Sequence, residues 1–117
     1  MNSEAAIAML VDKFPNLLDR VDSPLDAFIA SPYLAYGLFA QEVIDNRSDR
    51  TFMDRVCAFI DQLAESGDKL LEEVLVLSVL ERVAEDGSLA RELKGKLGVK
   101  AQKLIERVES EYFGRTN

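Results

Sequence analysis

The feature that most constrains this chain is a long apolar segment, residues 69–84, which contains no glycine, proline or asparagine. Strands of globular proteins are usually shorter, so a segment of this length without a turn signal indicates a helix. Its apolar residues fall on nearly every side of such a helix: Leu70, Leu71, Val74, Leu75, Val76, Leu77, Val79, Leu80 and Val83. Because a helix that is apolar all round must be buried, the sequence predicts a domain built around this segment.

The segments on either side also carry helical patterns. Residues 52–63 place large apolar side chains at i, i+4, i+7 and i+11, namely at Phe52, Val56, Phe59 and Leu63. Helix starts are indicated at Ser3, Ser23-Pro24, Ser31-Pro32, Asp68 and Asp86-Gly87-Ser88. Helix ends are indicated at Phe14-Pro15, Gly67, Gly98 and Gly114.

These patterns predict an all-α fold. No run of short alternating strands joined by hairpin turns occurs in the chain. At 117 residues the chain has the size of one ordinary domain, so residues 1–117 are expected to form a single compact domain. About six to seven helices are expected, arranged as a bundle or as stacked helical hairpins.

Cysteine usage and hydropathy indicate a cytoplasmic location. The single cysteine, Cys57, excludes an internal disulfide and is expected to be a small buried thiol. The first residues lack the basic region of a signal peptide. The longest apolar run, residues 74–80, is far shorter than a membrane span, so no membrane partner is expected.

Charge is distributed unevenly along the chain, whose net charge is −7. Residues 42–86 contain twelve acidic and five basic residues, whereas residues 87–117 contain four acidic and seven basic ones. Because phosphate contacts require Lys and Arg, direct nucleic-acid binding is not expected. An acidic surface favours a basic protein partner, although acidic surfaces also serve solubility alone.

Chemistry-bearing motifs are scarce, and no catalytic or cofactor-binding residue is expected. The chain has no histidine and no glycine-rich phosphate loop. Glu42 and Asp45 match half of the carboxylate pattern with which all-helical nucleotide hydrolases bind magnesium, but Val76 stands where the other half, after Glu72-Glu73, needs a carboxylate. Such spacings are common by chance, and solvated helix faces are the more usual explanation of these pairs.

The second half of the chain resembles a known group of proteins. The segments that carry the resemblance lie at residues 59–64, 66–68, 73–81, 97–102 and 111–113. They are similar to small acidic bacterial proteins that include the immunity proteins of polymorphic-toxin and contact-dependent inhibition systems. The resemblance spans roughly residues 38–113 and leaves residues 1–37 without an assigned role.

The resemblance implies a protein that binds a cognate toxin and covers its active or substrate-binding surface. Many such toxins are nucleases with basic clefts, which an acidic surface would complement. The candidate partner-binding residues, chosen by charge and expected exposure, are Asp45, Asp49, Asp54, Asp61, Glu65, Asp68, Glu72 and Glu73. The aromatic pair Tyr112-Phe113 either anchors the last helix or offers a contact surface.

Two other functions stay open at this stage. The chain fits a different helical interaction module, such as an adaptor or a regulator, equally well in composition. A magnesium-dependent nucleotide hydrolase that uses Glu42 and Asp45 is a minor alternative. The sequence leaves the oligomeric state and the identity of the partner undetermined.

Overall fold

The apolar segment forms one continuous helical rod at the centre of the molecule, as predicted. The structure, a computed structural model, describes residues 1–114. The rod consists of α5 (Lys69–Val74), a π-helical part η2 (Leu75–Leu80) and α6 (Glu81–Ala84). At the end of η2 the backbone N–H of Glu81 donates to the carbonyl of Val76, five residues earlier. That bond is the wider π-helical one, which recurs at functional sites in helices.

The other elements are helical as well. They are α1 (Ser3–Lys13), the 3₁₀ turn η1 (Pro15–Asp19), α2 (Pro24–Ala30), α3 (Pro32–Asp45), α4 (Arg50–Glu65), α7 (Gly87–Lys94) and α8 (Val99–Phe113). No strand occurs within residues 1–114. The radius of gyration, 13.4 Å, is that of a compact domain of this length, about 13 Å for 100 residues. The predicted all-α, single-domain fold is confirmed.

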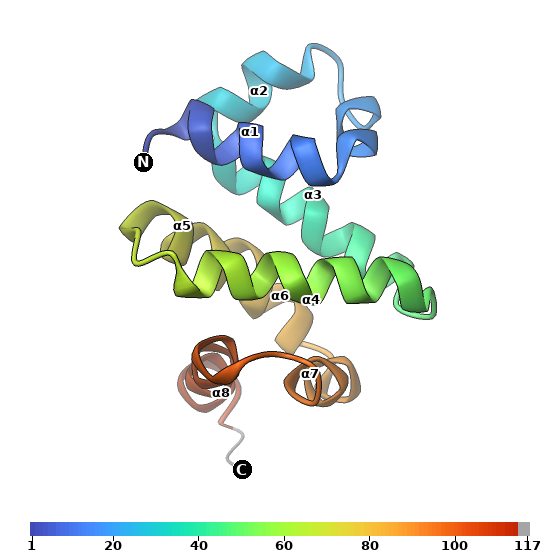
Figure 1. The fold of residues 1–117 in the computed structure, drawn as a ribbon, viewed down its shortest axis with the longest axis vertical. Helices are drawn as coiled ribbons and strands as arrows, with labels where there is room; N and C mark the ends of the chain where they lie inside the picture. Colours follow the sequence, from blue (N-terminus) through green and yellow to red (C-terminus); the bar gives the residue numbers. More distant parts are fainter. Residues whose placement is uncertain (115–117) are drawn as a thin grey trace.

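The helices are arranged around the rod (Figure 1). The π-helical part η2 packs against α3, α4 and α8. The first helices, α1 and α2, pack against each other and against α3, at one end of the long axis. The last two, α7 and α8, lie at the opposite end and pack against α6. The rod therefore connects an N-terminal layer to a C-terminal layer.

An aromatic cluster fills the core between α1, α3 and α4. The Phe14 ring lies 4.8 Å from the Phe39 ring and 5.5 Å from the Phe59 ring, centre to centre. The buried Tyr36 hydroxyl donates a 2.8 Å hydrogen bond to the carbonyl of Ala6. Burial also raises the pKa of Tyr36. The hydrogen bond from Tyr36 to Ala6 fixes α1 on α3, since an unpaired Tyr36 hydroxyl in the core would be destabilising.

The helix ends predicted at Phe14-Pro15, Gly67 and Gly114 are confirmed, but the end predicted at Gly98 is wrong, because α7 ends at Lys94 and Gly98 instead precedes α8. Gly67 adopts the left-handed conformation, with φ of 71°, and Gly114 does so with φ of 66°. The Asp68 carboxylate accepts a 3.0 Å hydrogen bond from the N–H of Leu71 and so caps α5. Cys57 is buried, as expected.

The predicted start of α1 is wrong by one residue. Asn2, rather than Ser3, caps the helix, because its side-chain oxygen accepts from the N–H of Ala5 at 2.9 Å. Asparagine is at least as good a cap as serine. The helix start predicted at Asp86-Gly87-Ser88 lies at Gly87, the residue after the Asp86 cap.

Candidate functional site

The eight acidic residues predicted as a partner surface are spread over both ends of α4, its outward face and α5. Asp45 and Asp49 are at the turn that joins α3 to α4, whereas Glu65 and Asp68 are at the link from α4 to α5. Because α4 has 16 residues, these two groups are about 24 Å apart along the helix.

Several of these carboxylates stabilise helix ends by accepting hydrogen bonds. Asp49 caps α4 by accepting a 3.1 Å hydrogen bond from the N–H of Phe52. Asp68 accepts from Leu71 and also, at 2.7 Å, from the N-terminal ammonium of Met1. The bond from the ammonium is the main cause of the lowered pKa of Asp68. The sequence identified Asp68 as a helix start but did not identify Asp49 as one.

On the outward face of α4, Asp61 accepts a hydrogen bond from the backbone, whereas Asp54 and Glu65 are exposed. Asp61 accepts a 2.8 Å hydrogen bond from the N–H of Gly98, the residue that precedes α8. This bond satisfies one of the backbone donors that a helix start leaves open, and it joins α4 to α8. Asp54 lies 3.6 Å from the ammonium of Lys96 in an exposed ion pair, and Glu65 is exposed.

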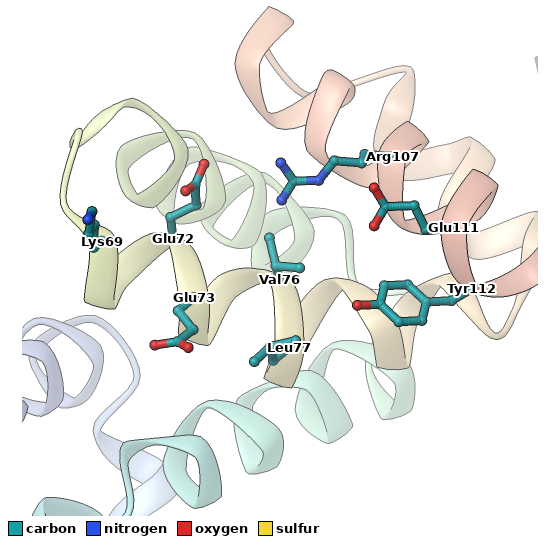
Figure 2. A pocket seen from close by; sticks show the side chains of 8 residues that line it. All are labelled: Lys69, Glu72, Glu73, Val76, Leu77, Arg107, Glu111 and Tyr112. Carbon is teal, nitrogen blue, oxygen red and sulfur yellow. The ribbon is translucent and has the colours of Figure 1, made fainter.

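The remaining two predicted residues, Glu72 and Glu73, belong to a groove between the rod and α8 (Figure 2). The groove has a volume of about 540 Å³. Its walls carry Lys69, Glu72, Glu73, Val76 and Leu77 from the rod, and Arg107, Glu111 and Tyr112 from α8. We call these eight residues the rod–α8 groove.

Apolar side chains are exposed in the rod–α8 groove. Leu77 is 44% exposed although Val76 and Ser78 on either side of it are buried. The prediction that the whole segment is buried is therefore wrong at Leu77, which lies within the π-helical part. Tyr112 on the opposite wall is 54% exposed. Figure 2 shows the Val76, Leu77 and Tyr112 side chains near one another between the two walls.

Carboxylates surround these apolar side chains on both walls. Glu72 and Glu73 come from α5 and Glu111 comes from α8, and all three are exposed. Glu73 also accepts a hydrogen bond from the exposed Tyr33 at the start of α3, and this bond is the main cause of the raised pKa of Tyr33. The surface thus continues from the groove onto α3. Apolar and tyrosine side chains encircled by charged groups are typical of protein-binding surfaces.

The residues of the magnesium hypothesis have protein partners instead. Glu42 forms an ion pair with Arg20 and accepts a hydrogen bond from the Asn46 amide at 3.1 Å. Asp45 accepts a 2.8 Å hydrogen bond from Gln41. Among the residues that the structure describes, no group of three or more His, Cys, Asp or Glu side chains is placed to hold a metal ion. The structure therefore gives the hydrolase hypothesis no support.

Two further findings concern the single cysteine and the membrane. Cys57 is only 6% exposed, and its burial raises the pKa of the thiol, which lowers the fraction of reactive thiolate. Within residues 1–114 no helix combines the length and the apolar character that crossing a bilayer requires.

Fold and groove together define an all-α domain that presents an acidic, partly apolar groove between two helices. The chain belongs to the family described as a domain of unknown function, DUF7674, whose model matches residues 7–113. The match covers α2 to α8 entirely and residues 7–13 of α1, so it includes most of the N-terminal layer as well as the groove. No curated protein and no solved structure matches the chain.

Of the eight groove residues, sequence reasoning included only Glu72 and Glu73 among its candidates. Leu77, Arg107 and Glu111 were not among the candidates, and Tyr112 was left between two roles. The sequence contained a signal that Tyr112 could be exposed, because an aromatic pair at the end of a helix need not pack into the core. Leu77 carried no such signal, because it stands in the most apolar segment of the chain.

Proposed function

We propose that this protein binds a basic toxin domain in the bacterial cytoplasm and neutralises it by covering its active or substrate-binding surface. The observation that carries the proposal is the exposure of Leu77 and Tyr112 in a groove whose rim bears Glu72, Glu73 and Glu111.

The composition of the groove supports protein binding. Tyrosines are enriched at interfaces because they combine a large apolar area with a polar tip, and they often dominate the binding energy. Leu77 adds an aliphatic contact beside Tyr112. A ring of charged residues around such a centre keeps the unbound surface soluble and pairs with charges on the partner.

The charge of the molecule supports a basic partner. The net charge of −7 and the three glutamates of the groove would attract a positively charged surface and accelerate association. Clefts that hold nucleic-acid phosphates are basic, so a nuclease-type toxin has the matching chemistry. The family description states no function, and the choice of a toxin therefore rests on this charge and on the sequence resemblance of residues 38–113.

Co-expression tests the proposal. The product of the open reading frame immediately upstream is induced in cells with and without this protein, and growth and copurification are measured. We expect the upstream product to arrest growth alone, and the two proteins to restore growth and to copurify. A harmless upstream product that copurifies would favour an adaptor or regulator instead. Growth arrest without rescue would contradict the proposal.

Matched variants connect that result to the groove. Leu77→Asp places a charge on the exposed apolar centre and should abolish rescue, because a buried unpaired carboxylate at an interface opposes binding. Leu25→Asp makes the same chemical change at another exposed leucine, on α2, and should leave rescue intact.

A further inference from the structure

We infer that the rod–α8 groove receives one amphipathic helix of the partner, whose apolar anchor residues are flanked by Lys or Arg. This inference rests on the proposed function, since it names the element by which the partner is bound. It is carried by the shape of the groove, by its exposed apolar centre and by the placement of its carboxylates.

The shape of the groove fits side chains that project from a helix. One wall runs along residues 69–77 and the other along residues 107–112, so the walls are about 12 Å and 8 Å long. A volume of about 540 Å³ is enough for a few side chains but not for a whole helix. An amphipathic helix that lies across the opening would insert anchors spaced by three or four residues, the usual way in which such grooves are filled.

The apolar centre selects the anchor side chains. Leu77 and Tyr112 are exposed on opposite walls, and the nearly buried Val76 stands beside Leu77 on the rod. An aliphatic or aromatic anchor that reaches this point would remove apolar surface of both walls from water at once. Because removing apolar area from water is favourable, this contact is expected to be the main source of affinity.

The carboxylates select the residues beside the anchor. Glu72 and Glu73 stand on the rod with Lys69, and Glu111 stands on α8 with Arg107, so carboxylates lie on both sides of the apolar centre and outnumber the cations by one. A helix that carries Lys or Arg one turn before and after its anchor would meet a carboxylate on each wall.

The same charges disfavour a second copy of the chain as the occupant. Two copies that meet through the rod–α8 groove would bring six glutamates together, three from each chain, and like charges at an interface oppose association. Arg107 and Lys69 offset part of this repulsion only.

The test uses three synthetic helical peptides of about four turns with the same length and label. The first has a Leu stripe and Lys elsewhere, the second has a Leu stripe and Glu elsewhere, and the third has Lys with Ser in place of the stripe. Binding to the full-length protein is measured by fluorescence anisotropy, and the site by NMR chemical-shift mapping on ¹⁵N-labelled protein. The oligomeric state is measured by light scattering.

We expect the Lys/Leu peptide to bind more tightly than both controls and to shift the amide signals of residues 69–77 and 107–112. Leu77→Asp should weaken its binding at least about tenfold, a change of about 1.4 kcal/mol, and Leu25→Asp should not weaken it. Preferential binding of either control peptide, no binding of the Lys/Leu peptide, shifts confined to other surfaces, equal binding by both variants, or a dimer that Leu77→Asp dissociates would each overturn the inference.

The two failures are distinguishable. Rescue from the upstream product without peptide binding in the groove would leave the proposed function standing and remove this inference. Peptide binding in the groove without any rescue would leave the groove as a docking site and remove the toxin.

Discussion

Acidic residues occupy two regions of this molecule and do different work in each. Asp49, Asp61 and Asp68, at the ends of α4 and at the start of α5, accept hydrogen bonds from backbone N–H groups. Glu72 and Glu111, in the rod–α8 groove, project beside exposed apolar side chains. The first region uses its charge to hold helices together, whereas we propose that the second uses it for recognition.

The difference teaches that charge density along the chain is a poor guide to a binding surface. Asp61 and Glu65 lie one helical turn apart on α4, yet one fixes the start of α8 and the other is exposed. The difference is that Asp61 lies close enough to an open backbone N–H, that of Gly98, to accept a hydrogen bond from it. Substitutions in the first region should therefore change stability, and substitutions in the groove should change binding.

The largest expected effect on stability is at a buried acidic residue that joins two helices through an ion pair. Glu109 on α8 is 5% exposed and lies 2.5 Å from the ammonium of Lys94 on α7. Glu109→Ala leaves the largely buried Lys94 without this carboxylate, and we expect the free energy of unfolding to fall by about 3 kcal/mol. Urea denaturation measures the change. Asp54→Ala, which removes an exposed ion pair, is the control and should cost about 0.5 kcal/mol or less. Equal losses in the two variants would contradict the contrast.

The next effect concerns the link between α4 and α8. Asp61→Ala removes the acceptor of the Gly98 N–H, and we expect a loss of about 1 kcal/mol in the free energy of unfolding. Asp61→Asn keeps an acceptor oxygen and should lose less. Glu65→Ala, four residues further along α4, should be nearly neutral. If the Asp61→Ala and Glu65→Ala proteins have the same urea midpoint, Asp61 has no structural role.

A smaller effect is expected from the charge of the α7 cap, because the Asp86 side chain is half exposed. The Ser88 hydroxyl, the N–H of Leu89 and the Arg47 guanidinium hold the pKa of Asp86 at about 2, below its ordinary 3.8. Since the folded pKa is lower than the unfolded one, Asp86 stabilises the fold above about pH 4, and the contribution is lost as the pH falls to about 2.

Thermal melts of wild type and Asp86→Asn measure this contribution. Asparagine keeps the capping oxygen, so the difference in melting temperature reports the charge. We expect wild type to be more stable above about pH 5, and the difference to shrink between about pH 4 and pH 2. A difference that is constant over this range would show that the charge of Asp86 does not stabilise α7.

The smallest effect on stability is expected in the groove. Glu73→Lys combined with Glu111→Lys should change the free energy of unfolding by about 0.5 kcal/mol or less, because both side chains are exposed. Rescue from the upstream product should nevertheless be lost. Asp12→Lys combined with Asp19→Lys changes the net charge equally at exposed positions in α1 and η1, and should preserve rescue. Equal loss of rescue in both proteins would mean that overall charge, and not the groove, governs the outcome.

The fold was largely predictable because its signals are local. The length and apolar character of residues 69–84 identified the central rod, and Gly67 with Asp68 identified its start. Such signals depend on residues within a turn or two, where helical geometry fixes which side chains are neighbours. The one-residue error at the start of α1 arose because two adjacent residues, Asn2 and Ser3, are both good caps.

The candidate site was much less predictable because its contacts are distant in sequence. Leu77 and Tyr112 are 35 positions apart, and only the packing of α8 on the rod brings them to the same groove. The exposure of Leu77 coincides with the π-helical part, and an apolar pattern read at α-helical spacing does not reveal that change. The bond between Asp61 and Gly98 spans 37 positions and was hidden for the same reason.

The most direct measurement is the affinity of the copurified upstream product for two variants, Glu73→Lys with Glu111→Lys and Asp61→Ala, beside their urea midpoints. We expect the groove variant to bind at least about tenfold more weakly with an unchanged midpoint. We expect the Asp61→Ala protein to bind normally with a lowered midpoint. Normal binding by the groove variant, together with weakened binding by folded Asp61→Ala protein, would contradict the division between recognition and structure.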